Sequence, residues 1–225
     1  KTQAELNAEL DAVASTVRST LVNILCYAPA GSNIRSISGS GIFVDSKGII
    51  LTNAHIAQYF LLADRGVGCT IRVGSPAVDT YKASLIYISP SWLKANPSVL
   101  TKEAPSGTGE YDFAFLAVSG STSGSTLPSS FPSIPLAVTP STAGAPVVIA
   151  SYGAQFLEQS QIQSSLFPTI VFGSIKDIYT FATNTIDVFA LGGSAAAQEG
   201  SSGGGVASAS GELVGTITTS TTKGT

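Results

Sequence analysis

Short apolar runs separated by turn residues are the feature that most constrains the fold of this chain. From about residue 21 onward, runs such as "STLVNILCYA", "YDFAFLAV" and "APVVIASYG" alternate with clusters of Gly, Ser and Pro. Between "GIFV" and "IILT", the segment "DSKG" predicts a tight turn, because Gly48 is free to adopt a positive φ. No long helical pattern interrupts these runs. The sequence therefore predicts an all-β protein, built as barrels or as sandwiches.

The first twenty residues differ, because they have the pattern of one helix. Leu6, Leu10, Val13 and Val17 follow a four-three-four spacing that places them on one apolar face, and the acidic residues lie off that face. Two interpretations remain open at this stage. The helix either docks on the domain or forms a stalk that leads in from an upstream segment.

A segment rich in Ser, Gly and Pro divides the β-rich part of the chain. Residues 119–135, "SGSTSGSTLPSSFPSIP", have a composition that we expect to be too polar to pack, so we interpret them as a linker. The expected organisation is a helix over residues 1–20, a first β domain over 21–118, this linker, and a second β domain over 136–225.

Composition excludes several classes of function. Only 11% of the residues are charged, less than half the usual share of about 25%. A net charge of −3 and a pI near 5.0 argue against a nucleic-acid-binding protein that uses a basic patch. No apolar run approaches the roughly 18 residues of a membrane span. One histidine and two cysteines cannot supply the four ligands of a Cys/His zinc site, so we expect no metal.

The single histidine, His55, directly follows the apolar run "IILT". A lone histidine is most often a satisfied structural residue, but one at a strand end is held at the edge of a barrel. Asp112 begins the run "DFAFLAV". It is either a strand-start residue or a buried acceptor for the Nδ1–H of an imidazole, which would leave Nε2 free to act as a base. Asp187 has a similar apolar setting but lies in the other half of the chain from His55.

Ser202 lies in the glycine-rich segment "EGSSGGG". Glycines let the backbone bend tightly and let a substrate approach closely. The backbone N–H groups of Gly200 and Ser202 can point to one place, where they would stabilise an oxyanion. The alternative is a flexible Gly/Ser loop in a chain that contains many such residues.

In combination, these motifs resemble the trypsin-like (chymotrypsin-fold) serine peptidases, most closely their HtrA-like branch. The strings "GSGIFVDSKGIILTNAHI", "YDFAFLAV" and "GSSGGGVASASGELVGTIT" occur in the order in which that family carries its His, Asp and Ser. The resemblance implies a fold of two six-stranded antiparallel β-barrels. It also implies that His55 is the general base, Asp112 its orienting carboxylate and Ser202 the nucleophile, with the N–H groups of Gly200 and Ser202 as the oxyanion hole.

The same resemblance implies a specificity pocket. Ala196, six residues before the nucleophile, would lie at its base, and one wall would be formed by Thr218, Thr219 and Ser220. No carboxylate is available at the base, so we expect small or aliphatic side chains before the scissile bond. Digestive relatives carry Asp immediately before the nucleophile, where this chain has Ser201, so activation through an ion pair at that position is not expected.

Two structural expectations accompany the resemblance. We count five strand-like runs in the second half, where the family has six strands, so the last strand is removed, disordered or supplied from elsewhere. Cys26 and Cys69 flank the hairpin that leads to His55. They are either a disulfide, which the extracytoplasmic setting of the family favours, or two buried thiols.

The functional expectation is a serine endopeptidase that acts on proteins or peptides and needs no metal or organic cofactor. We expect it outside the cytoplasm, whether periplasmic, cell-surface or secreted, and a segment outside this chain could tether it to a membrane. The alternative is a latent or inactive trypsin-like domain that serves as a binding module. The sequence leaves the oligomeric state open.

Overall fold

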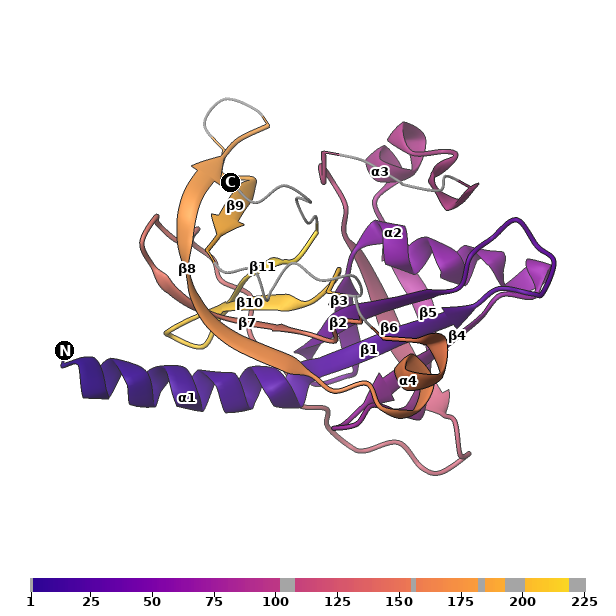
Figure 1. Ribbon diagram of the computed structural model, residues 1–225, viewed down its shortest axis with the longest axis horizontal. Coiled ribbons are helices and arrows are strands. Elements are labelled where there is room, and N and C mark those ends of the chain that lie inside the picture. The colour runs from indigo at the N-terminus through magenta and orange to yellow at the C-terminus, as the bar shows by residue number, and fades with distance from the viewer. Residues whose placement is uncertain (1, 102–107, 155–156, 182–184, 193–200, 219–225) are drawn as a thin grey trace.

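In the computed structural model, the chain forms two β-sheets side by side, with a long helix along the second (Figure 1). The structure describes residues 2–101, 108–154, 157–181, 185–192 and 201–218. The first sheet closes into a six-stranded barrel, and the second is a five-stranded, curled half-barrel. The expectation of an all-β, chymotrypsin-like double barrel with an N-terminal helix is confirmed.

The closed barrel has the strand order β1-β2-β3-β6-β5-β4, with every neighbouring pair antiparallel. Its strands are β1 (Leu21–Tyr27), β2 (Ile37–Asp45), β3 (Ile49–Thr52), β4 (Gly68–Val73), β5 (Val78–Ile88) and β6 (Ala114–Ser121). Alternate residues of β1, namely Val22, Ile24 and Cys26, belong to the barrel core and are fully buried. Gly48 has a φ of 85° in the turn between β2 and β3, as its position in "DSKG" predicts.

The second sheet has the order β11-β10-β7-β8-β9 and is open among the described residues. Its strands are β7 (Pro146–Ser151), β8 (Thr169–Tyr179), β9 (Val188–Leu191), β10 (Gly205–Ser208) and β11 (Leu213–Thr216). These are the five runs that the sequence analysis counted in this half.

Helix α1 (Gln3–Thr20) docks on the second sheet. Thr2 and Glu5 form a capping box at its start. Leu10, Val13 and Val17 are buried in one core with residues of β7 and β10, so the helix docks on the domain. The shorter helices are α2 (Ala54–Ala57), η1 (Gln58–Arg65), α3 (Pro90–Ala95), η2 (Val99–Thr101) and α4 (Gln159–Ser164). Within the described residues, no helix combines the length and the apolar character that a membrane span requires.

The expectation that the Ser/Gly/Pro segment does not pack is wrong. Strand β6 extends to Ser121, and two later residues of the segment, Phe131 and Ile134, are 7% and 0% exposed. The backbone N–H of Phe131 donates to the Ser46 carbonyl, and the Phe131 ring packs against the aromatic side chains of Phe43 and Tyr81. The average composition of the segment does not indicate that single apolar residues in it are buried. Burial of these two side chains is enough to hold the segment against the first barrel.

A disulfide joins Cys26 on β1 to Cys69 on β4. The two residues are direct partners in the antiparallel pairing of these strands, and their Cα atoms are 4.0 Å apart. Of the two interpretations left open by the sequence, the structure therefore contains the disulfide.

Candidate active site

Paired strands bring His55 and Asp112 to one edge of the first barrel. His55 lies in α2, which is separated from β3 by Asn53 alone, and Asp112 lies two residues before β6. Strands β3 and β6 are neighbours, with Thr52 opposite Ala114. His55 lies three residues after the end of β3, and Asp112 lies two residues before the start of β6. The pairing of the two strands therefore brings these side chains together, although they are 57 residues apart in the chain.

The Asp112 carboxylate contacts both the ring and the backbone of His55. Nδ1 of His55 is 2.6 Å from Oδ2 of Asp112, and the backbone N–H of His55 donates to Oδ1 at 2.9 Å. The Asp112 side chain is 6% exposed, whereas the imidazole is 24% exposed. An ionised carboxylate can only accept, so Nδ1 carries the proton in this contact and Nε2 is the nitrogen left for proton transfer.

Ser202 lies in the turn that precedes β10 and is half-buried. Its carbonyl accepts the backbone N–H of Ser40 on β2 at 2.7 Å, which ties the turn to the first barrel. The next residue, Gly203, has a φ of 83°, and its N–H donates to the Ile217 carbonyl at 2.8 Å. Within the described part of the chain, no hydrogen bond joins the Ser202 hydroxyl to the imidazole of His55.

Of the residues expected to form the oxyanion hole and the specificity pocket, the structure describes Ser202 and Thr218. Gly200, Ala196, Thr219 and Ser220 lie outside the described residues. Thr218 is half-buried, and its Oγ1 lies 3.2 Å from the side-chain nitrogen of Asn53.

Two further polar residues that the sequence analysis singled out have structural partners. Ser201 is buried, with its hydroxyl 3.2 Å from that of Ser151, so the position that precedes the candidate nucleophile is filled by a neutral hydroxyl pair. Asp187 accepts from Phe181 N and from the hydroxyls of Thr180 and Thr185, and thereby closes the connection between β8 and β9.

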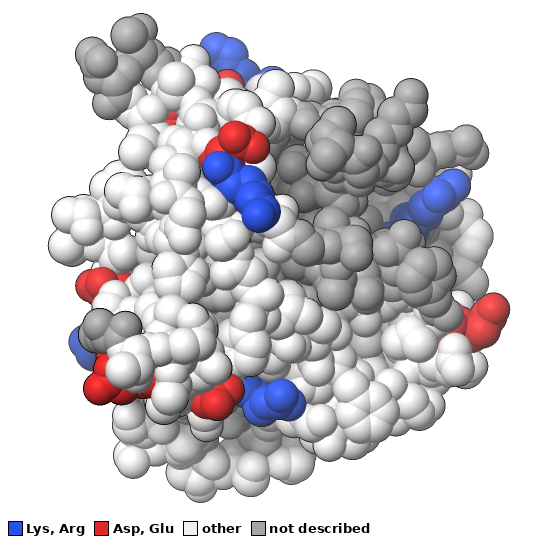
Figure 2. Space-filling model, turned by 60° about the vertical axis from the view of Figure 1, so that its left-hand side comes forward, with Lys and Arg blue, Asp and Glu red and all other residues white. Residues whose placement is uncertain are grey.

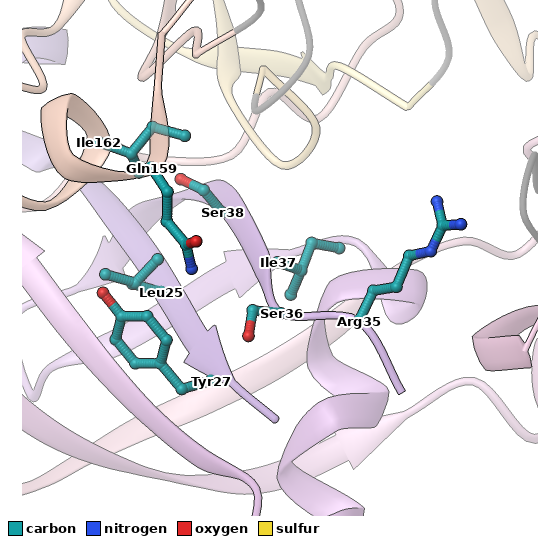
Figure 3. A pocket seen from close by; sticks show the side chains of 8 residues that line it. All are labelled: Leu25, Tyr27, Arg35, Ser36, Ile37, Ser38, Gln159 and Ile162. Carbon is teal, nitrogen blue, oxygen red and sulfur yellow. The ribbon is translucent and has the colours of Figure 1, made fainter. Parts of the chain in front are cut away.

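A cavity of about 350 Å³ lies between the first barrel and α4 (Figure 3). Leu25 and Tyr27 of β1 and Ser38 of β2 line the barrel side, while Gln159 and Ile162 extend from α4. Ser38 is two residues from Ser40, whose N–H binds the Ser202 carbonyl. The cavity therefore lies along the same strand that contacts the turn holding Ser202.

A buried arginine holds α4 in this place. Arg72 of β4 is 1% exposed and donates to the carbonyls of Ile162 and Gln163 at 2.8 and 2.6 Å. It also donates to the Ala77 carbonyl at 2.7 Å, and its Nε lies 3.3 Å from the exposed carboxylate of Asp79. Arg72 thus fastens the connection between β7 and β8 to the first barrel.

Sequence reasoning missed Arg72 and Asn53, both of which are buried and act across large sequence separations. Neither belongs to a local pattern that would have signalled its role. Helix α3 was also missed, although Ser89 before Pro90 is a recognisable helix start, with the Ser89 hydroxyl accepting the Trp92 N–H.

Charged groups are sparse on the surface. Figure 2 shows one face on which blue and red side chains lie singly or in small groups among white. The described residues on this face form no continuous basic patch, in agreement with the 11% charged composition.

Comparisons with known proteins agree on one fold. The sequence profile of a trypsin-like peptidase domain matches residues 39–215. Among solved structures, the active form of the Rv3671c protease from M. tuberculosis is 19% identical with a TM-score of 0.57, covering 96% of this chain and 76% of that one. The inactive form of Rv3671c is 20% identical with a TM-score of 0.55, covering 96% and 83%. Deg5 is 14% identical with a TM-score of 0.62, covering 97% and 86%. No protein of curated function matches the chain.

Proposed function

The chain belongs to the trypsin-like peptidase family, and on this premise we propose that it is a serine endopeptidase whose triad is His55, Asp112 and Ser202. The observation that carries the proposal is the contact of 2.6 Å between Nδ1 of His55 and the buried carboxylate of Asp112. A structural histidine needs no carboxylate that binds both its ring and its backbone N–H. We also propose that the enzyme is of the HtrA-like type, which the likeness of its fold to Deg5 supports.

In the proposed mechanism, Ser202 Oγ attacks the carbonyl carbon of the scissile peptide bond, and its proton passes to Nε2 of His55. Asp112 stabilises the imidazolium that forms. His55 then gives the proton to the leaving amine, which departs and leaves an acyl-enzyme on Ser202. Water, deprotonated by His55, hydrolyses the ester. The N–H groups of Gly200 and Ser202 would hold the oxyanion in both steps.

We propose that the substrate lies as an extended strand between the two halves of the molecule. The residues before the scissile bond would run beside Thr218, Thr219 and Ser220, with a small or aliphatic side chain above Ala196. The cavity along β2 offers apolar and hydroxyl groups to the residues that follow the bond.

The disulfide supports a location outside the cytoplasm, because such bonds form and persist in oxidising compartments. Unfolded proteins or flexible loops are the expected substrates, since only an extended segment can enter a cleft of this kind.

The function is tested by peptide hydrolysis. Wild type should cleave extended peptides that carry Ala or Val before the scissile bond, and Ser202→Ala should reduce kcat by about 10³-fold or more. Ser210→Ala is the matched control, because this exposed serine lies on the surface turn between β10 and β11. Equal hydrolysis by wild type and Ser202→Ala would overturn the assignment.

A second candidate is a latent peptidase that needs a ligand or a second copy to complete its site. It is favoured by the missing hydrogen bond between Ser202 and His55 among the described residues, and by the existence of active and inactive forms of the Rv3671c protease. A latent enzyme should hydrolyse peptides only after an activating peptide is added. A domain that serves only as a binding module should bind peptides and hydrolyse none under any condition.

A further inference from the structure

Asn53 lies where three segments of the candidate site meet, yet the proposed mechanism gives it no role. It follows β3, precedes α2 and is fully buried. Asparagine at a helix start ordinarily caps the helix with its side-chain oxygen. Here the side chain makes no capping bond, and only the backbone carbonyl of Asn53 accepts from α2. The amide is therefore directed elsewhere.

The side-chain nitrogen of Asn53 has two partners far away in the sequence. Nδ2 donates to the backbone carbonyl of Asp112 at 2.9 Å and to Oγ1 of Thr218 at 3.2 Å, across 59 and 165 residues. An amide carries two N–H donors, so both are used. Thr218 follows β11 in the second sheet, and this hydrogen bond therefore joins the two halves of the molecule.

Only one orientation of the amide fits these neighbours. The reverse orientation would place Oδ1 against the Asp112 carbonyl oxygen, and two acceptors repel each other. In the orientation observed, Oδ1 is buried and accepts no hydrogen bond from a described residue. A buried acceptor without a donor destabilises a fold. We would not expect a residue that serves packing alone to keep such an unpaired buried acceptor, so the two N–H donors are the useful part of this side chain.

Asp112 is held at both ends by one short segment. His55 binds its carboxylate through two nitrogens, and Asn53 binds its carbonyl. The backbone around Asp112 is irregular, because Tyr111 has a φ of 57° and the regular strand begins only at Ala114. Without Asn53, the peptide that follows Asp112 keeps, among the described residues, only the hydrogen bond from the Phe113 N–H to the Tyr111 carbonyl, within the same irregular segment. Loss of the Asn53 bond therefore loosens the position of Asp112, and with it the position of the carboxylate relative to the imidazole.

We propose that Asn53 is a positioning residue that couples the catalytic carboxylate to the substrate-binding wall at Thr218, an inference that rests on the proposed peptidase function. One N–H sets the position of Asp112 against His55, which governs kcat. The other N–H sets Thr218 at the start of the wall, which governs KM.

The test uses three variants of the whole chain. Asn53→Asp keeps the shape of the side chain and removes both donors. Thr218→Val keeps the branched shape and removes the acceptor on the wall. Asn96→Ala is the control, because the amide of Asn96 donates to a backbone carbonyl, that of Trp92, outside the site. Each variant is titrated with a fluorophosphonate, and kcat and KM for an extended peptide are measured per labelled site, together with Tm.

Asn53→Asp should lower kcat per site about tenfold or more and raise KM. Thr218→Val should raise KM by a larger factor than it lowers kcat. Asn96→Ala should keep both constants whatever happens to its Tm. If Asn53→Asp does not fold, Asn53→Ser, which keeps one donor, takes its place and should show the same direction of change.

Wild-type kcat and KM per site in the Asn53 and Thr218 variants would overturn the positioning role, because a purely structural residue changes Tm and the active fraction alone. Failure of the proposed function is distinct, since the wild type itself would then neither react with the fluorophosphonate nor cleave peptide.

Discussion

The glycine after Ser202 offers a quantitative test of how the two halves of the molecule meet at the candidate nucleophile. Gly203 has a φ of 83°, and a Cβ built on it would overlap the Ser40 carbonyl oxygen of β2. That oxygen cannot move aside easily, because the Thr52 hydroxyl donates to it at 2.7 Å. Gly203→Ala therefore combines backbone strain with a clash against the wall of the first barrel.

Gly144 is the matched control. Its φ is also 83°, but a Cβ there would meet no atom within 4 Å. Gly144→Ala should cost only the left-handed strain of about 1–2 kcal/mol. Gly203→Ala should cost about 1–3 kcal/mol more for the overlap. In a domain of this size each kcal/mol lowers Tm by about 2–4 °C. The clash should also displace Ser202 and lower kcat by about 100-fold, since a shift near 1 Å has that effect.

Calorimetry and peptide hydrolysis of the two alanine variants give the comparison. Gly144→Ala should lose some Tm and keep its wild-type kcat, whereas Gly203→Ala should lose more Tm and most of its activity. If the two variants have the same Tm and the same kcat, the turn at Ser202 does not pack against β2 as described, and the reasoning fails.

Three further predictions concern the acid, the disulfide and a buried tyrosine. Asp112→Asn should lower kcat by about 10³- to 10⁴-fold at neutral pH, because an amide can stabilise the wrong imidazole tautomer. Asp187→Asn is the control, since Asp187 lies in the connection between β8 and β9, and this variant should keep the wild-type kcat. Equal losses of kcat in both variants would contradict the choice of Asp112. Cys26→Ser should destabilise the fold by about 4 kcal/mol on loop entropy alone, since 43 residues separate the cysteines; an unchanged Tm would exclude this contribution. Burial raises the pKa of Tyr152. The neutral side chain therefore contributes its full stabilisation at any pH below the ordinary tyrosine pKa. This contribution is lost as the pH rises through the folded-state pKa. Tyr152→Phe loses a hydrogen bond to the Gly74 carbonyl and should be about 1 kcal/mol less stable at pH 7. In urea unfolding this deficit should shrink above about pH 10, and a deficit that grows with pH would contradict the assignment.

The strands of this protein could be predicted from the sequence because their signals are local. Apolar runs bounded by Gly, Ser and Pro correspond to the strands, and Gly48 occupies the turn that its motif predicts. The pairing of His55 with Asp112 came from the order of motifs that resemble one family, and the register of β3 and β6 explains why the two residues meet.

What escaped prediction depends on partners far away in the chain. Asn53 contacts residues 59 and 165 positions away, and Arg72 contacts α4 across 90 residues. Neither residue type marks such a partner in advance. Phe131 and Ile134 were hidden by the polar composition around them, because composition averages over a segment while burial is decided residue by residue.

The central claim is that Ser202 is a nucleophile activated by His55, and covalent labelling tests it most directly. A fluorophosphonate should attach to intact protein at neutral pH, and mass spectrometry of the digested product should place the added mass on Ser202. His55→Ala should lower the labelling rate by about 10³-fold or more. Labelling that is absent under all conditions, or that falls on another serine, would contradict the account.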